Sequence, residues 1–153
     1  MSYVLDTSAL VGAWVRSYPP DSFPALWDSL DKLVEAGRLT APEEVFEELK
    51  AQDDDLYKWV KDRKDAIIVP TSRAVMLEAR AILADHPRLT MPGRGRGRAD
   101  PFVIALACTQ GAVVVTQEQG GSADKPRIPY VCKQRAVGCA ELLDVIRREG
   151  WTF

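Results

Sequence analysis

Short apolar runs alternate with helical patterns along this chain of 153 residues, and that alternation constrains the fold more than any other feature. Residues 3–5 and 112–115 are apolar runs of strand length, the second rich in β-branched valine. The segments between them carry apolar residues at helical spacing. Strands that alternate with helices predict an α/β fold, namely a three-layer, doubly wound sheet of mostly parallel strands with helices on both faces.

The expected elements follow from this spacing and from helix-ending residues such as Gly37 and Gly150. We expect helices over 9–15, 23–36, 42–49, 74–84, 102–108 and 140–148, with a further capped helix starting at the aspartates 53–55. Strands are expected over 3–5, 67–69 and 112–115, and an extended link over 38–41. Residues 91–101 are expected to be a mobile basic loop, residues 126–129 a turn, and residues 131–137 a short segment of unassigned type.

The length and composition favour one domain over residues 1–153 in a cytoplasmic protein. The 22 acidic and 20 basic residues give a net charge of -2, so any nucleic-acid binding must be local. Three cysteines without CxxC spacing suit reduced thiols in a cytosol. We expect no membrane association, because no apolar stretch approaches the roughly 18 residues of a membrane span and the start lacks a basic leader.

Polar side chains follow two of the expected strands at the point where each strand ends. Asp6 follows the first strand, and Thr116 and Glu118 follow the strand over 112–115. In open parallel sheets the functional crevice lies beyond the carboxyl ends of the strands. These side chains are therefore candidates for a functional site.

Four segments resemble signatures of the PIN-domain family: YVLDTSAL at the start, PEEVFEEL in the third helix, ADPFVIALA in a later helix, and VVVTQE after the last buried strand. The combination of SYPPDSFPALWDSL, DDDLYKWVK and ADPFVIALA also resembles a bacterial PIN-like subfamily related to toxin–antitoxin ribonucleases of the VapC type. The resemblance spans most of the chain. It implies a PIN-like fold and a metal-dependent nuclease.

Carried over by position, the resemblance implies an acidic site of Asp6, Glu48, Asp100 and Glu118, which would be both catalytic and metal-binding. The order agrees with that of the family: one acid after the first strand, one late in a helix, one opening a later helix and one after the next strand. Two choices stay open. The neighbouring glutamates 43, 44 and 47 compete with Glu48, and Asp124 competes with Glu118, which stands where the family usually has aspartate.

The chemistry of this residue set favours a hard divalent cation. Two unit charges about 4 Å apart repel by roughly 4 kcal/mol at an effective dielectric near 20, so converging carboxylates need a counter-charge. Oxygen donors favour Mg²⁺ or Mn²⁺ over zinc. We expect Ser8 and Thr116 to orient the metal ligands or a water.

Structural readings compete with these functional ones. Asp100 stands before a proline where a helix cap is common, and Asp6 could cap the helix that follows it, although Thr7 and Ser8 are expected to take that role. The arginines at 94, 96 and 98 are candidate RNA contacts, because guanidinium pairs with phosphate in a bidentate manner and their run ends two residues before Asp100. The alternative interpretation is that these arginines belong to a solvated loop that binds nothing.

These observations predict a divalent-metal-dependent endoribonuclease that hydrolyses RNA phosphodiester bonds. The family resemblance further implies the toxin of a toxin–antitoxin pair, with a cognate antitoxin protein and a homodimer as partners. The alternative is a PIN-like module that keeps the fold with weak or no catalysis and serves in nucleic-acid binding or protein interaction. The atypical Glu118 is what makes this alternative worth testing.

Overall fold

The structure is a computed structural model that describes residues 1–90 and 98–153. The described residues form a five-stranded sheet in the order β3-β2-β1-β4-β5, and every neighbouring pair of strands is parallel. The strands are β1 (Tyr3–Leu5), β2 (Leu39–Pro42), β3 (Ile68–Val69), β4 (Val113–Val115) and β5 (Cys139–Ala140). The predicted α/β fold class with a parallel sheet is confirmed.

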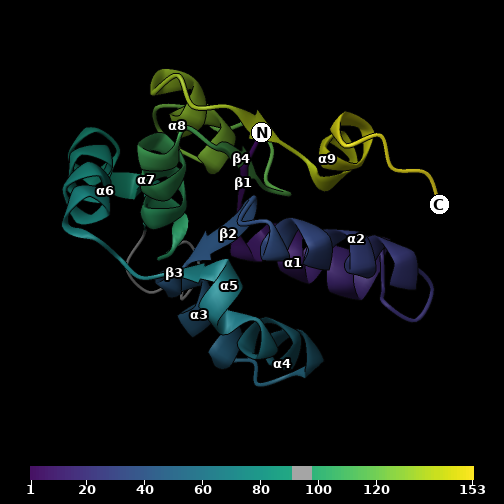
Figure 1. The fold of residues 1–153 in the computed structure, drawn as a ribbon. Coiled ribbons are helices and arrows are strands. Elements are labelled where there is room, and N and C mark those ends of the chain that lie inside the picture. Colours follow the sequence, from purple (N-terminus) through teal and green to yellow (C-terminus); the bar gives the residue numbers. More distant parts are fainter. Residues whose placement is uncertain (91–97) are drawn as a thin grey trace.

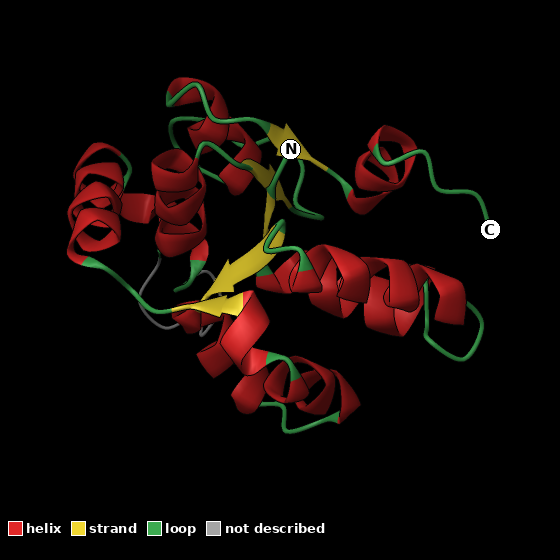
Figure 2. Cartoon of the chain, viewed as in Figure 1, coloured by secondary structure: helices red, strands yellow, loops and turns green. Residues whose placement is uncertain are grey.

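Helices cover both faces of this sheet, which gives the expected three layers (Figures 1 and 2). One face carries α1 (Thr7–Gly12) and α2 (Pro24–Glu35), and the other carries α6 (Arg73–Asp85), α7 (Asp100–Gln110) and α8 (Ile128–Gln134). The remaining helices are α3 (Glu43–Lys50), α4 (Asp55–Asp62), α5 (Lys64–Ile67) and α9 (Leu142–Arg148), with a 3-10 turn η2 (Pro87–Leu89) after α6. No helix within the described ranges is long and apolar enough to cross a membrane.

The strand order places a topological switch point between β1 and β4. The chain builds outward from β1 through β2 to β3, then returns to the other side of β1 for β4 and β5. Leu5 pairs with Val115 in register, and the Asp6 backbone N–H donates to the Val115 carbonyl at 3.1 Å. Because ligands of open α/β sheets bind at such a point, the residues that follow β1 and β4 are the first place to look for a site.

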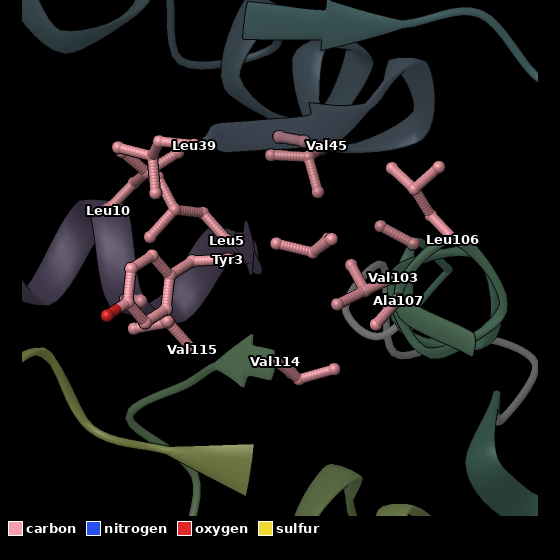
Figure 3. Packing of buried hydrophobic residues seen from close by; sticks show 14 of the residues in the cluster. Tyr3, Leu5, Leu10, Leu39, Val45, Val103, Leu106, Ala107, Val114 and Val115 are labelled. Atoms are coloured by element: carbon pink, nitrogen blue, oxygen red, sulfur yellow. The ribbon is translucent and has the colours of Figure 1, made fainter. Parts of the chain in front are cut away.

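The core fills the space between sheet and helices (Figure 3). All three residues of β1 are buried, as expected for a parallel strand covered on both faces. Helix α7 packs between the sheet and α6, which explains why Val103, Leu106 and Ala107 point into the cluster with Val114. Its apolar sequence is therefore the signature of a central helix rather than of a surface helix.

Helix α2 shows how local sequence sets an element end. Pro24 occupies its first turn, where the missing backbone N–H costs nothing, and Leu30 and Leu33 face the core. After the helix, Gly37 adopts a positive φ of 71°, and the N–H of Arg38 donates to the Leu33 carbonyl at 2.9 Å. This Schellman motif ends the helix where the sequence predicted.

The first helix starts earlier than expected and ends differently. It begins at Thr7 and passes into a π-helical turn, η1 (Ala13–Ser17), in which the Tyr18 N–H donates to the Ala13 carbonyl at 2.8 Å. Such i to i+5 turns carry no clear sequence signal and are frequent at functional sites. The turn moves Ser17 and Tyr18 toward the carboxyl end of the sheet, where they line a cavity described below.

Two expectations for the connecting segments are wrong. Residues 38–41, expected as an extended link, mostly belong to β2, whose four residues are buried between β1 and β3. Residues 126–129, expected as a turn, contain the start of α8, which buries Ile128 and Val131 and carries Pro129 in its first turn. The expected mobile loop is mostly outside the described residues, because 91–97 are not described.

Candidate functional site

Asp6 is held in place by several donors. It follows β1, is 2% exposed, and caps α1 by accepting a hydrogen bond from the Ala9 N–H at 2.7 Å. The Ser8 hydroxyl donates to its carboxylate at 2.8 Å, and the Thr116 hydroxyl donates to Oδ2. The expectation that Thr7 and Ser8 would cap the helix is therefore wrong: Asp6 is the cap, and Ser8 orients it.

The ionisation of Asp6 reflects two opposing effects. Burial raises its pKa, the hydrogen bonds from Thr116, Ala9 and Ser8 lower it, and the nearby charge of Glu118 raises it, with a net result of about 6. A buried carboxylate with this many donors is fixed in one orientation. A pure helix cap on a solvated surface has no such environment.

Glu48 lies late in α3 and faces the same region. Its Oε1 accepts a hydrogen bond from the Thr7 hydroxyl at 3.0 Å, which ties α3 to the start of α1. Burial raises the pKa of Glu48, whereas hydrogen bonds from Thr7 and from the Ala99 backbone, and the charge of Arg98, lower it. Glu118 contributes a raising charge, so the two glutamates are electrostatic neighbours.

The competing glutamates of α3 lie elsewhere. Glu43 and Glu44 both accept hydrogen bonds from Thr71, at 3.0 and 2.6 Å respectively. Glu47 is exposed. Of the α3 glutamates, Glu48 is therefore the one that joins the acidic group, as the family position implied.

Asp100 is the first residue of α7 and is not its cap. Ala99 occupies the cap position, and no side-chain cap hydrogen bond is found there. Burial, followed by the charges of Glu118, Asp6 and Glu48, raises its pKa to about 8. The structural alternative for Asp100 therefore has no support here, while its acidic neighbours are the other members of the predicted set.

Glu118 follows β4 and is anchored through both its backbone and its side chain. Its N–H donates to the Thr116 hydroxyl at 3.0 Å, and its Oε2 accepts from the Ile128 N–H at 3.1 Å. The competing acid, Asp124, is exposed, and its backbone carbonyl accepts from Arg88 at 3.4 Å. Glu118, unlike Asp124, raises the pKa of the three other acids.

The structure thus gathers four acids from four separate segments at the carboxyl end of the sheet. Each of Asp6, Glu48 and Asp100 has its pKa raised by Glu118. The donor set consists of carboxylate oxygens with excess negative charge, which fits a hard divalent cation. In residues 1–90 and 98–153, no three His, Cys, Asp or Glu side chains stand close enough to form a ready-made metal centre. Mg²⁺ commonly uses only one or two carboxylates plus waters, so the donor set remains compatible with it.

The predicted RNA-contacting arginines are only partly described. Arg98 is exposed and close enough to Glu48 for its charge to lower the pKa of that carboxyl. Arg94 and Arg96 lie outside the described residues. The phosphate-binding role of the three arginines stays a prediction.

Two contributors to the site were not found from the sequence. Thr7 was taken as a helix cap, yet its hydroxyl holds Glu48. The backbone N–H of Ile128 donates to Glu118, and the type of a residue does not indicate whether its backbone N–H will bind a side chain. The position of Thr7 directly after the first-strand aspartate is the signal that could have suggested its role.

Comparison with known proteins places this chain in a family. A family model described as "Domain of unknown function (DUF4411)" matches residues 3–153. The chain belongs to the DUF4411 family. No curated protein matches this DUF4411 chain.

The DUF4411 chain is also similar to a solved structure. A chain in the crystal structure of VapBC2 from Rickettsia felis, bound to a DNA fragment from their promoter, matches with a TM-score of 0.54 and 13% identity. The match covers 92% of the DUF4411 chain and 98% of that chain. At this identity the likeness shows the fold, which agrees with the PIN-like architecture that the sequence resemblance implied.

Proposed function

We propose that the protein is a divalent-metal-dependent endoribonuclease that hydrolyses RNA phosphodiester bonds. The observation that carries the proposal is the meeting of Asp6, Glu48, Asp100 and Glu118 at the switch point between β1 and β4. Structural carboxylates gain nothing from this arrangement, because mutual repulsion destabilises them unless a cation is bound. The PIN-like fold adds support at the level of the family.

The four acids would hold Mg²⁺ or Mn²⁺. Such an ion activates water as a nucleophile and stabilises the charge that develops on a phosphodiester. The chain supplies the positioning: Ser8 and Thr116 fix Asp6, Thr7 fixes Glu48, and the Ile128 N–H fixes Glu118. For Asp100 no such donor is found in the described part of the chain.

We further propose that the protein is the toxin of a toxin–antitoxin pair, with an antitoxin as partner. The support is the sequence resemblance to toxin–antitoxin ribonucleases, together with the fold shared with the VapBC2 chain. The three arginines at 94, 96 and 98 would contact RNA phosphates, and Arg98 lies close enough to Glu48 for its charge to lower the pKa of that carboxyl.

A second candidate is a PIN-like module without catalysis. One observation favours it: among the described side chains no compact group of three metal ligands is present. Glu118 in the place of the family's usual aspartate points the same way.

A cleavage assay separates the two candidates. Purified protein, freed of any bound partner by denaturation and refolding, is incubated with a panel of single-stranded and structured RNAs. We expect cutting with Mg²⁺ or Mn²⁺, none with a chelator, and recovery when the ion is restored, because water activation depends on it. An Asp100→Asn protein purified in parallel controls for contaminating nucleases. Absence of metal-dependent cutting over the whole panel would leave the non-catalytic module.

A further inference from the structure

A cavity of about 270 Å³ adjoins the acidic site. It shares residues with that site, since Ala9 and Thr116, which donate hydrogen bonds to Asp6, also line the cavity. A second cavity, lined by Glu118, meets the first at Thr116, Gln119 and Glu141. A chain bound along Glu118 can therefore continue into the first cavity without leaving the surface of the protein.

The walls of the first cavity combine apolar and aromatic groups with a few amides. Tyr18 lies on one side and the α9 residues Leu142 and Leu143 also line the cavity. Tyr18 is held by two contacts: its carbonyl accepts from Trp27 Nε1 at 2.7 Å, and its ring packs edge-on against Phe23 at 5.4 Å between centroids. Ligand pockets of drug-sized molecules span roughly 300–1,000 Å³, so this smaller cavity suits one planar ring system.

The side-chain amide of Gln117 is the polar group that we expect to hydrogen-bond to a ligand in this cavity. Its backbone N–H donates to Ser8 at 3.1 Å, which fixes the chain next to Asp6, while its exposed side-chain amide has no hydrogen-bond partner among the described residues. The amide rests directly on α1 at Gly12, because a Cβ at Gly12 would overlap it. Gly12 has an ordinary helical φ of -62°, so an added Cβ there would displace the Gln117 amide without straining the backbone.

Two of the other polar side chains of the wall bond to each other. Gln119 Nε2 donates to Glu141 Oε1 at 3.0 Å, and the Glu141 carboxylate also caps α9. Among the side chains that line the cavity, the Gln117 amide has both a donor and an acceptor available for a ligand edge within the described residues. A glutamine amide presents one donor and one acceptor side by side. These match the ring nitrogen N7 of adenine, which accepts, and its N6 amino group, which donates.

We propose that this cavity binds an adenine base of the RNA substrate, with Gln117 reading the base edge and Tyr18 contacting its face. Proteins that recognise single-stranded RNA commonly combine an aromatic platform with hydrogen bonds to a base edge. The assignment of RNA as the source of the base rests on the proposed ribonuclease function. The cavity would then select which nucleotide lies next to the acidic site.

The test is an NMR titration with the four nucleoside 5′-monophosphates, without added metal, and with ribose 5-phosphate as the control without a base. Because the phosphate is common to all probes, differences report the base. We expect AMP to bind at least about fivefold more tightly than CMP or UMP, with shifts at the Gln117 side-chain amide. Equal affinity for the four, preference for another base, or shifts away from the cavity would overturn the proposal.

Two variants tie the preference to Gln117. Gln117→Leu keeps the size of the side chain and is expected to bring AMP to within about twofold of the other nucleotides, as is Gly12→Ala, whose Cβ displaces the amide while alanine favours the helix. Gln134→Leu, at an exposed position on α8, is the matched control and should keep the preference. An AMP preference that survives Gln117→Leu in folded protein would refute the assignment.

The titration and the cleavage assay fail independently. Protein that cuts RNA with metal but binds the four nucleotides equally would keep the ribonuclease and lose the adenine subsite. Protein that prefers AMP through Gln117 but cuts no RNA would keep the subsite and lose the nuclease.

Discussion

Asp6→Asn and Asp100→Asn are each expected to lower metal-dependent RNA cleavage by at least about a hundredfold. Both side chains belong to the acidic group, and loss of a ligand carboxylate removes part of a stabilisation worth several kcal/mol, where each 1.4 kcal/mol is about tenfold in rate. The measurement is single-turnover cleavage of the best RNA from the panel. Asp124→Asn, in the exposed loop after β4, is the matched control and should cut like the parent.

The same variants should remain folded. Asparagine is itself a good helix cap, so Asp6→Asn can keep the hydrogen bond from the Ala9 N–H. Asp100 does not cap α7, so its amide replacement loses no bond there. Thermal unfolding in chelator should give melting temperatures equal to or above that of the parent, since one repelling charge is gone. Cleavage at parental rates by both variants would show that the acids serve another purpose.

The metal-free protein is expected to lose stability as pH rises from about 4 to about 8. In the unfolded chain both aspartates have ordinary pKa values near 3.8, while burial raises the pKa of Asp6 to about 6 and that of Asp100 to about 8. Between these limits the native state binds more protons than the unfolded state, so the free energy of unfolding falls as pH rises. The Asp6 contribution is lost by about pH 6, and the Asp100 contribution by about pH 8.

Asp100→Asn isolates the second part of this pH dependence. At pH 8 in chelator, we expect its melting temperature to exceed that of the parent by roughly 5 °C, since 1 kcal/mol corresponds to about 2–4 °C in a domain of this size. At pH 4 the two proteins should melt alike, because the parent carboxyl is then protonated. Melting curves of parent and variant that stay parallel from pH 4 to pH 8 would contradict the raised pKa of Asp100.

The fold class was predictable from the sequence, and candidate acids could be named, because both rest on patterns that extend over several residues. The valines of β4, the helical spacing of apolar residues in α2 and the continuous apolar run in α7 identify buried elements from residue type alone. Asp6 and Glu118 could be placed because parallel strands bring their carboxyl ends to one edge. Glu48 and Asp100 came from the family resemblance, since a glutamate on a helix and an aspartate before proline have ordinary structural uses.

The features that the sequence did not reveal depend on tertiary contacts. β2 has a polar threonine and a proline in its four residues, and only pairing with β1 and β3 makes it a strand. β5 has two residues, too few for any period. Whether Asp6 or Ser8 caps α1 is decided by the position of Thr116, which is 110 residues away from Asp6 in the chain. The cavity beside Gln117 depends on the π-helical turn, which has no sequence signal.

Calorimetric titration of Mn²⁺ into metal-free protein tests most directly whether the four acids form a metal site. We predict saturable binding by the parent and by Asp124→Asn, and binding weakened at least about tenfold in Asp100→Asn, because a ligand and its charge are lost. Mg²⁺ should compete for the same site. Equal affinity of Mn²⁺ for the parent and for Asp100→Asn, or no saturable binding by the parent, would contradict the assignment of this acidic group as a metal site.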